Sequence, residues 1–562
     1  MGVDVGERRY LELAEFWIEN RGNHQGRASM EAYDQDDKSV FDQPALEGHA
    51  VRAGLLAAGI ALAAGVNHRP DYYATARRWW DNMVEAKMYV TGGLGAIPTF
   101  EGFGADYELP NDGYAETCAA VGGAFFSQNL GLVMGSAEYF DILERELFNG
   151  ALSGVSLAGD SYFYTNYLAS TPDRRRWSWN GCPCCPPMFL KLMSSLSGSI
   201  YATDAGGVYV NQFVGSRAEI AQDGLDLTLT QKTGYPWNGG VRLDVSPRKP
   251  SHFAVSLRIP GWSRNASYRL NGRPIDPQIA RGYARFERTW HPGDVVEVDM
   301  PMPVTRVRAD RRVTADVGRV ALMRGPVVYC LEGLDNHGRI DALVIPPSTE
   351  IRAEHRPDLL GGVTTLHGDA QRVRPSGDVE NVSFTAVPFY ANTNREPTDM
   401  AVWIAERRDV ASTPTLAGES TPSASHRNAS DTVWALGNGQ SPRASDDDSI
   451  PRFTWWDHQG TAEWVQYDFP QTETVDAVDV YWWDESRVHR DCRVPQSWVV
   501  EYRDGDEWLL VQAIGDYPTA MDVFNCVKFA PVNTTGLRIT VQLQAGWSAG
   551  ILQWRVSTAG SA

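Results

Sequence analysis

The sequence is poor in cysteine: it has seven in 562 residues, and three of the seven fall within four residues, in WNGCPCCPPMF. Thiols this few and this unevenly spread do not form the disulfide framework of a small secreted domain. A cluster of thiols is more typical of a metal site or a catalytic site. A redox role for the C-P-C sequence is a weaker alternative.

Long apolar runs are also missing. The longest has 14 residues, from 53 to 66, which is too short to span a bilayer and indicates a buried helix. The start, MGVDVGERRYLELAEFW, has neither the apolar segment of a secretory signal nor the Ser or Thr that myristoylation needs. The sequence therefore leaves the localisation open between cytoplasmic and secreted.

Basic residues are outnumbered by acidic ones, and the net charge is −19. A surface of this sign repels nucleic acid and anionic membranes, so we expect neither as a partner. The length of 562 residues is too great for one domain and predicts three or four, each with its own core.

What the sequence does contain changes character near residue 205. Upstream, apolar residues recur every three to four positions, as in YFDILERELFNGAL. The predicted helices are 8–20, 47–65, 70–86, 116–134, 137–153 and 187–202. Their sequential pairs suggest part of an (α/α)6 toroid over residues 1–204. Six helices are half of what a closed toroid of six hairpins needs, so we expect an apolar face that further helices or another chain would cover.

Downstream of residue 205, short stretches that alternate apolar and polar residues predict strands, as in FAVSLRIPGW. We expect a β-sandwich over 205–305 and a second one over 306–407. A stretch rich in Ser, Thr and Pro predicts a linker over 408–422, and residues 423–562 read as an independent β-sandwich. The predicted fold class is therefore multidomain, with α followed by β.

The cysteine cluster has an upstream counterpart. YAETCAA supplies Glu116 and Cys118, and the cluster supplies the adjacent Cys184 and Cys185. Three thiolates and a carboxylate are donors that zinc accepts, and zinc sites close at four ligands. The spacing alone is not a recognised zinc signature, and a free cysteine usually behaves as a small buried hydrophobe. From the residues alone, both interpretations stay open.

Longer motifs add a family resemblance. They include EGHAVRA, WDNMVEAKMYVTGGLGA, YELPNDGYAETCAAVG, LERELFNGALSGVSLAGDSYFYTNYL and GCPCCPPMFLKLMSSLSGSIYA, and they continue downstream with YPWNGGVRLDV, LRIPGWS and ALMRGPVVYCLE. With these motifs, residues 1–407 resemble the bacterial β-L-arabinofuranosidases of glycoside hydrolase family 127. The resemblance implies an (α/α)6 barrel followed by two β-sandwiches. It also implies that this chain begins partway into the barrel.

The resemblance implies a mechanism as well. Similar proteins use a zinc-bound cysteine as nucleophile and a glutamate as acid/base, and they release β-L-arabinofuranose from plant glycans or glycoproteins with retention of configuration. By motif, the nucleophile is Cys184. The acid/base is Glu101, with Glu108 as a nearby competitor. The implied Zn2+ ligands are Glu116, Cys118, Cys184 and Cys185.

Three further residues match sugar-binding positions of the family: His49, Glu144 and Tyr164. Each also has a plainer interpretation. His49 lies in an Ala-rich helix as a core histidine would, Glu144 could pair with Arg145 on a helix surface, and Tyr164 could simply pack. Cys182 has no family role, and we expect it to pack inside the protein.

The last block resembles a discoidin-like module, often a carbohydrate-binding module on bacterial glycosidases, through DHQGTAEWVQYDF, VDVYWWDE and VPQSWVVEYRDGDEW. Loop aromatics of such modules stack on sugars, and Trp455, Trp456 and Trp483 are candidates for stacking or for the core. Some modules of this fold bind a structural Ca2+. Cys492 and Cys526 are a candidate disulfide.

Two functions from different classes follow. The first is a retaining exo-glycoside hydrolase that acts on an arabinofuranosyl-containing glycan. The alternative is a catalytically inactive fragment that acts as a carbohydrate-binding protein. The oligomeric state is not predicted.

Overall fold

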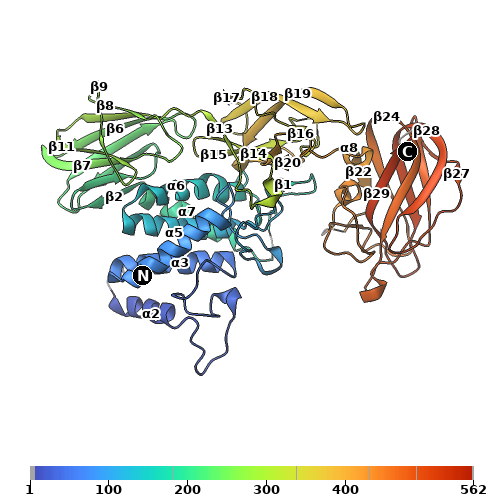
Figure 1. The fold of residues 1–562 in the computed structure, drawn as a ribbon, viewed down its shortest axis with the longest axis horizontal. Helices are drawn as coiled ribbons and strands as arrows, with labels where there is room; N and C mark the ends of the chain where they lie inside the picture. Colours follow the sequence, from blue (N-terminus) through green and yellow to red (C-terminus); the bar gives the residue numbers. More distant parts are fainter. Residues whose placement is uncertain (1–6, 180, 337, 429–430, 489, 560–562) are drawn as a thin grey trace.

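The computed structural model describes residues 7–179, 181–336, 338–428, 431–488 and 490–559. Figure 1 shows a layer of helices at the N-terminal end of the chain and three β-units after it. The first two β-units lie along one side of the helices, and the C-terminal β-unit stands apart at one end. The sequence predicts a multidomain chain with helices first and several β-sheets afterwards, and this coarse fold is confirmed.

The helical layer matches the predicted helices in order and approximate extent. Its helices are α2 (Arg8–Glu19), α3 (Ala50–Asn67), α4 (Pro70–Asn82), α5 (Thr117–Met134), α6 (Ala137–Arg145) and α7 (Cys185–Ser195). Two of them continue into a π-helical turn, Met83–Lys87 after α4 and Glu146–Ala151 after α6. Whether this layer is part of a toroid stays a prediction.

Small residues bring α3 and α5 together. A Cβ on Gly54 would lie 3.1 Å from the carbonyl carbon of Gly122, and one on Gly65 would collide with Val133. Such close approach is open only to glycine at these positions. Because Gly54 meets Gly122 and Gly65 meets Val133, the two helices run parallel. Their N-terminal ends therefore lie at the same end of the layer.

Both α3 and α5 are long and apolar enough to cross a membrane by length and composition alone. At least half of each helix is buried inside the fold, as in the core helices of many proteins. The helical layer also has exposed apolar side chains, among them Phe16 and Trp17 on α2 and Leu62 on α3. The apolar face that the sequence led us to expect of this layer stays a prediction.

The first β-unit is a sandwich. One sheet contains β2 (Tyr201–Asp204), β3 (Gly207–Val210), β7 (Ser251–Arg258), β10 (Gln278–Ala280) and β11 (Tyr283–Trp290). The other contains β4 (Ser216–Ile220), β5 (Leu227–Thr233), β6 (Gly240–Pro247), β8 (Ser267–Leu270), β9 (Arg273–Pro274) and β12 (Asp294–Asp299). Alternate residues of both sheets, such as Leu243 and Val255, form the buried core between them.

The second β-unit differs from the predicted sandwich because its strands form one continuous sheet. They are β13 (Val304–Val307), β14 (Arg319–Arg324), β15 (Val327–Glu332), β16 (Leu343–Val344), β17 (Arg352–Arg356), β18 (Val363–Val373), β19 (Val379–Pro388), β20 (Met400–Ala401) and β21 (Ile404–Ala405). Pairing of β14 with β15 closes part of this sheet on itself. The alternating pattern predicts strands, but a closed sheet and two facing sheets have the same alternation.

The helical layer is joined to the second β-unit. Strand β1 (Ala169–Ser170), which belongs to the helical part of the chain, pairs with β20. Tyr89 and Ala115 from the helical part also pack with Val328 and Phe389 of this β-unit in one buried cluster. The loops that lead to the N-terminus of α5 are therefore held by a rigid sheet.

The C-terminal β-unit has one sheet with two very long strands. Its strands are β22 (Thr421–Ala424), β23 (Phe453–Thr454), β24 (Ala462–Trp483), β25 (Ser497–Asp504), β26 (Glu507–Leu510), β27 (Ala513–Ile514), β28 (Asn525–Gln542) and β29 (Gly550–Thr558). Register shifts interrupt the pairing of β24 with β28 and β29. The discoidin-like assignment stays a prediction.

Several expectations for this part of the chain change. The stretch 408–422 contains a short helix, α8 (Leu416–Glu419), and Leu416 packs in the core of the C-terminal unit, so its second half is structured. Trp455 and Trp483 are buried in the core and have no face for a sugar, whereas Trp456 is only partly buried. Cys492 and Cys526 are both free.

Candidate metal and catalytic site

Two helix N-termini supply the thiols and the carboxylate that the sequence singled out. Glu116 is the N-cap residue of α5, and Cys118 lies in the first turn of that helix. Cys184 is the N-cap residue of α7, and Cys185 is its first residue. Pro186 and Pro187 follow in the first turn of α7, where a backbone N–H has no partner within the helix, so proline loses no hydrogen bond there. The positive end of each helix dipole faces these acidic groups and stabilises their negative charge.

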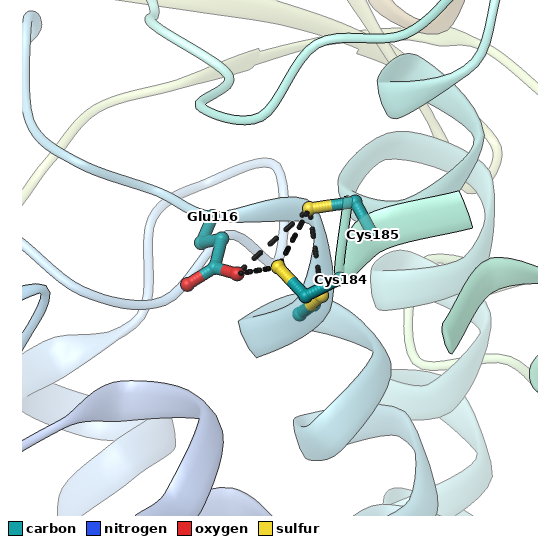
Figure 2. A group of neighbouring side chains, drawn as sticks. Glu116, Cys184 and Cys185 are labelled. Carbon is teal, nitrogen blue, oxygen red and sulfur yellow. Dashed lines mark hydrogen bonds between the residues drawn. The ribbon is translucent and has the colours of Figure 1, made fainter. Parts of the chain in front are cut away.

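The four side chains converge on one point, and Figure 2 shows Glu116, Cys184 and Cys185 pointing toward it. The ligand atoms of Glu116, Cys118, Cys184 and Cys185 all lie within 4.8 Å of one another. Cys185 Sγ lies 3.4 Å from Cys118 Sγ and 3.8 Å from Cys184 Sγ. Glu116 Oε1 lies 3.3 Å from Cys184 Sγ and 3.8 Å from Cys185 Sγ. All three cysteines are free, so this is not a disulfide.

These separations fit a tetrahedral metal ion. With metal–sulfur bonds of about 2.3 Å, two sulfur ligands of zinc are about 3.8 Å apart, and a sulfur and an oxygen ligand are about 3.6 Å apart. The measured distances of 3.3 to 3.8 Å fall near these values. The group could therefore hold a metal ion. Within the described part of the chain, no other cluster of His, Cys, Asp and Glu has this property, so the predicted Ca2+ in the C-terminal unit has no support.

The charges of the cluster also call for a cation. Burial raises the pKa of Glu116 to about 8. The hydrogen bond with Cys184 and that with Cys185 raise the pKa of the Cys118 thiol far above its usual range. In contrast, hydrogen bonds from Cys118 and Cys185 hold the pKa of Cys184 well below it. Without a metal, only one of the four groups carries its charge easily, and a divalent ion would let all four ionise.

Tyr114 is a neighbour of this cluster that the sequence analysis missed. Its hydroxyl donates a 2.7 Å hydrogen bond to Glu116 Oε2, which leaves Oε1 to face the thiols. Such contacts behind a metal ligand fix its orientation. The sequence gives no clear signal for this contact, because Ala115, between Tyr114 and Glu116, has a φ of 35° and the segment is not regularly extended.

Glu101 lies beside the cluster in a loop tied to α3. The backbone N–H of Ala50, at the start of α3, donates to the carbonyl of Glu101. The Glu101 backbone has a φ of 55°, which is uncommon for a residue with a side chain. The Glu101 side chain is 37% exposed, so solvent and ligands can reach it. Glu108 is exposed and accepts from the N–H of Ala105 within its own loop, away from this network.

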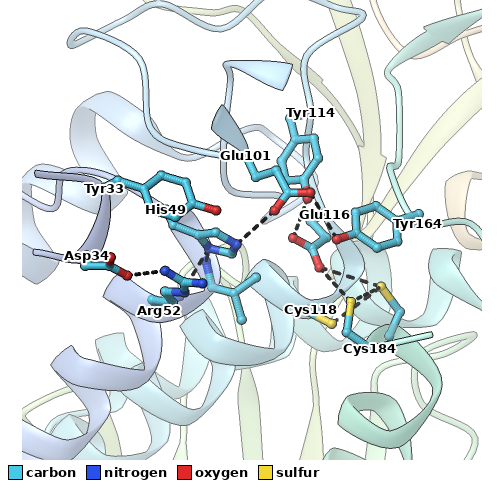
Figure 3. A network of polar contacts seen from close by, with 12 residues as sticks. Tyr33, Asp34, His49, Arg52, Glu101, Tyr114, Glu116, Cys118, Tyr164 and Cys184 are labelled. Carbon is cyan, nitrogen blue, oxygen red and sulfur yellow. Dashed lines mark hydrogen bonds and ion pairs between the residues drawn. The ribbon is translucent and has the colours of Figure 1, made fainter. Parts of the chain in front are cut away.

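His49 holds the Glu101 carboxylate from one side, as Figure 3 shows. His49 is the N-cap residue of α3, and its Nδ1 accepts from the N–H groups of Val51 and Arg52. Because Nδ1 is an acceptor, the proton of the neutral ring is on Nε2, which donates to Glu101 Oε2 at 3.1 Å. Burial lowers the pKa of His49 and so favours this neutral form.

Tyr164 holds Glu101 from the other side. Its hydroxyl donates to Glu101 Oε1 at 3.3 Å. The N–H of Thr117 donates to the Tyr164 carbonyl, and Glu116 pairs with Thr165, so the tyrosine is attached to the N-terminus of α5. Tyr164 therefore lies between Glu101 and the thiol cluster (Figure 3).

The structure does not bring Glu144 to this site. Its side chain is 2% exposed and forms an ion pair with Arg258 of β7, at the interface between α6 and the first β-unit. That fully buried pair explains the position of Glu144, and it also replaces the expected surface pair with Arg145. Cys182 is exposed rather than packed inside the protein; it is not one of the four converging ligands, but it interacts with the neighbouring Cys184 thiol.

The matches to known families give the class of protein. A family model described as the catalytic domain of glycoside hydrolase family 127, β-L-arabinofuranosidase, matches residues 2–198. Models of the middle and C-terminal domains of the same family match residues 207–302 and 304–405. The protein is thus a glycoside hydrolase.

Individual relatives agree with this assignment. A non-reducing end β-L-arabinofuranosidase of Bifidobacterium longum subsp. longum is 35% identical over 457 residues, which cover 71% of this chain and 68% of the relative. The crystal structure of a β-L-arabinofuranosidase from Geobacillus stearothermophilus T6 is 35% identical, with a TM-score of 0.69 and coverage of 72% of this chain and 70% of that one. A solved β-arabinofuranosidase of the family is 37% identical, with a TM-score of 0.70 and coverage of 73% and 68%. The chain belongs to glycoside hydrolase family 127, as its motifs indicate.

Proposed function

We propose that this protein is a retaining exo-glycoside hydrolase that releases β-L-arabinofuranose from the non-reducing ends of glycans, with Cys184 as nucleophile and Glu101 as acid/base. The observation that carries the proposal is the convergence of Glu116, Cys118, Cys184 and Cys185 within 4.8 Å beside the accessible Glu101. The names of the relatives support the substrate.

Glu116, Cys118, Cys184 and Cys185 would hold the metal ion, for which zinc is the proposed identity because thiolates are its preferred ligands. When bound, the ion would keep the thiols ionised at neutral pH and balance their charge. The protein contributes the geometry: Tyr114 orients Glu116, and the N-termini of α5 and α7 favour negative charge at the ligands.

In the first step, the Cys184 thiolate attacks the anomeric carbon of the arabinofuranose, and the bond from that carbon to the leaving oxygen breaks. The carboxylic acid of Glu101 gives its proton to this oxygen. A covalent sugar–cysteine thioether results, and Glu101 is left as a carboxylate. His49 and Tyr164 keep that carboxylate in position, since each donates to a different oxygen of Glu101.

In the second step, Glu101 takes a proton from a water molecule, and the water oxygen attacks the anomeric carbon. The carbon–sulfur bond breaks, and the Cys184 thiolate and the Glu101 acid are restored. Each step inverts the anomeric carbon, so the product keeps the β configuration.

The test is hydrolysis of p-nitrophenyl β-L-arabinofuranoside, with the anomer of the first product followed by proton NMR. Cys184→Ser should lose at least a thousandfold in rate while the protein still binds metal. Cys526→Ser is the control, because this thiol is exposed and lies on β28 of the C-terminal unit; it should keep the full rate. Full rate in Cys184→Ser would overturn the nucleophile, and an α product would overturn retention. Sugar binding without hydrolysis by the wild-type protein would favour the alternative of a carbohydrate-binding protein.

A further inference from the structure

A second cavity lies on the β-side of the helical layer. Its volume is about 750 Å³, within the range of small-molecule sites. It forms where α6 meets the loop after β7, strand β13 and the turn between β14 and β15, so three units of the fold enclose it. Neither Cys184 nor Glu101 lines it.

Arg145, the last residue of α6, lines this cavity. Among the residues that the structure describes, no hydrogen bond or ion pair of its guanidinium is found. Burial lowers the pKa of Arg145, and the charges of Asp141 and Glu146 oppose this shift. Arg145 is only partly buried, so a ligand in the cavity can contact it.

The carboxylates near Arg145 are already engaged. Asp141 accepts from Arg258 and from the N–H of Gly261, and Glu144 accepts from Arg258. Glu146 acts on Arg145 only through its charge, and burial raises the pKa of Glu146 well above its usual range, which favours its neutral form. A second arginine, Arg264, also lines the cavity. Arg145 and Arg258 together balance Asp141 and Glu144, so Arg264 gives the cavity a net positive charge.

One part of the cavity wall suits a sugar ring. Trp262 lines the cavity, and its indole Nε1 is buried with no hydrogen-bond partner among the described residues. One face of the indole stacks on Tyr235, with ring centroids 6.3 Å apart, which holds the ring in place. Pro301, Pro303 and Met323 add apolar surface. An aromatic wall of this kind can take the apolar face of a sugar.

We propose that this cavity binds a carboxylate-bearing sugar, a uronate residue of a glycan, with the carboxylate on Arg145 and the ring against Trp262. Arginine binds carboxylates through two parallel hydrogen bonds, which gives the site its specificity. The inference does not depend on the proposed catalytic function, because none of its residues belongs to the thiol site.

The test is isothermal titration calorimetry of the whole protein with sodium D-galacturonate, its methyl ester, acetate and inorganic phosphate. Galacturonate should bind at one site per chain, and the uncharged ester at least tenfold more weakly. Arg145→Gln should weaken galacturonate binding at least tenfold, and Arg145→Lys should restore part of it. Trp262→Phe should weaken galacturonate binding while the charge of the cavity is unchanged. If Arg145→Gln does not fold, the Trp262→Phe variant tests the site in its place.

Two control variants make the result specific. Arg248→Gln removes an exposed arginine that pairs with Asp226 outside the cavity, so it should leave binding unchanged. Cys184→Ser should also leave it unchanged, which separates this site from the catalytic one. Absence of galacturonate binding, full binding by Arg145→Gln, or equal affinity for the methyl ester would overturn the proposal. Equal binding of acetate or phosphate would show a general anion site and would overturn the sugar assignment.

Discussion

His49 has two contacts that substitution can separate. Nδ1 caps the N-terminus of α3, and Nε2–H donates to Glu101. Loss of an N-cap costs about 1 kcal/mol, and loss of a hydrogen bond to a charged group costs roughly 1.5–3 kcal/mol. Asparagine caps a helix well but is too short to replace Nε2. His49→Asn should therefore lose only the contact with Glu101, whereas His49→Ala should lose both contacts.

Both variants should lose about 10- to 100-fold in kcat/KM on p-nitrophenyl β-L-arabinofuranoside, since 1.4 kcal/mol is a factor of ten. Hydrogen exchange at the first turn of α3 should be about fivefold faster in His49→Ala, as about 1 kcal/mol of lost cap implies, and unchanged in His49→Asn. Local exchange suits a chain of several units better than one global unfolding energy. Full activity in His49→Asn would refute the role of the Glu101 contact, and equal exchange in the two variants would refute the cap.

Three further outcomes are expected. Tyr114→Phe should weaken zinc binding about 10- to 100-fold in competition with a chelator, because Glu116 loses the hydroxyl that orients it; unchanged affinity would contradict this. Between pH 4.5 and about 8, the metal-free folded protein holds a proton on Glu116 that the unfolded chain has lost, so the unfolding free energy of the metal-free protein should fall as pH rises. Zinc affinity should rise over the same range, because the metal needs the ionised carboxylate; a zinc affinity that does not change with pH would contradict this. Arg258→Met should lower the unfolding free energy by about 3–5 kcal/mol, because it leaves Asp141 and Glu144 buried without their cation. The double variant Arg258→Met with Glu144→Leu should recover part of this loss, measured by thermal unfolding, and no recovery would contradict the buried pair.

The helices could be read from the sequence because local patterns encode them. The residues alone left the thiols open between a metal site and buried side chains, and the family resemblance favoured the metal site. Apolar periodicity marked the helices, and adjacent cysteines followed by two prolines marked a helix N-terminus with its ligands already in place. Tyr114 escaped because a single tyrosine has no distinctive pattern.

Long-range partners were the harder part. Glu144 was misplaced because its partner Arg258 is 114 residues away, in another unit of the fold. The closure of β14 onto β15 likewise depends on pairing between strands, which alternation does not encode. The expectation for Cys182 failed because composition favours burial of cysteine, whereas the loop before α7 leaves this one in solvent.

The central claim is that Glu116, Cys118, Cys184 and Cys185 share one zinc ion. X-ray absorption at the zinc edge of the zinc-loaded protein measures this directly. The account predicts three sulfur atoms at about 2.3 Å and one oxygen at about 2.0–2.2 Å. A first shell of nitrogen and oxygen alone would contradict it.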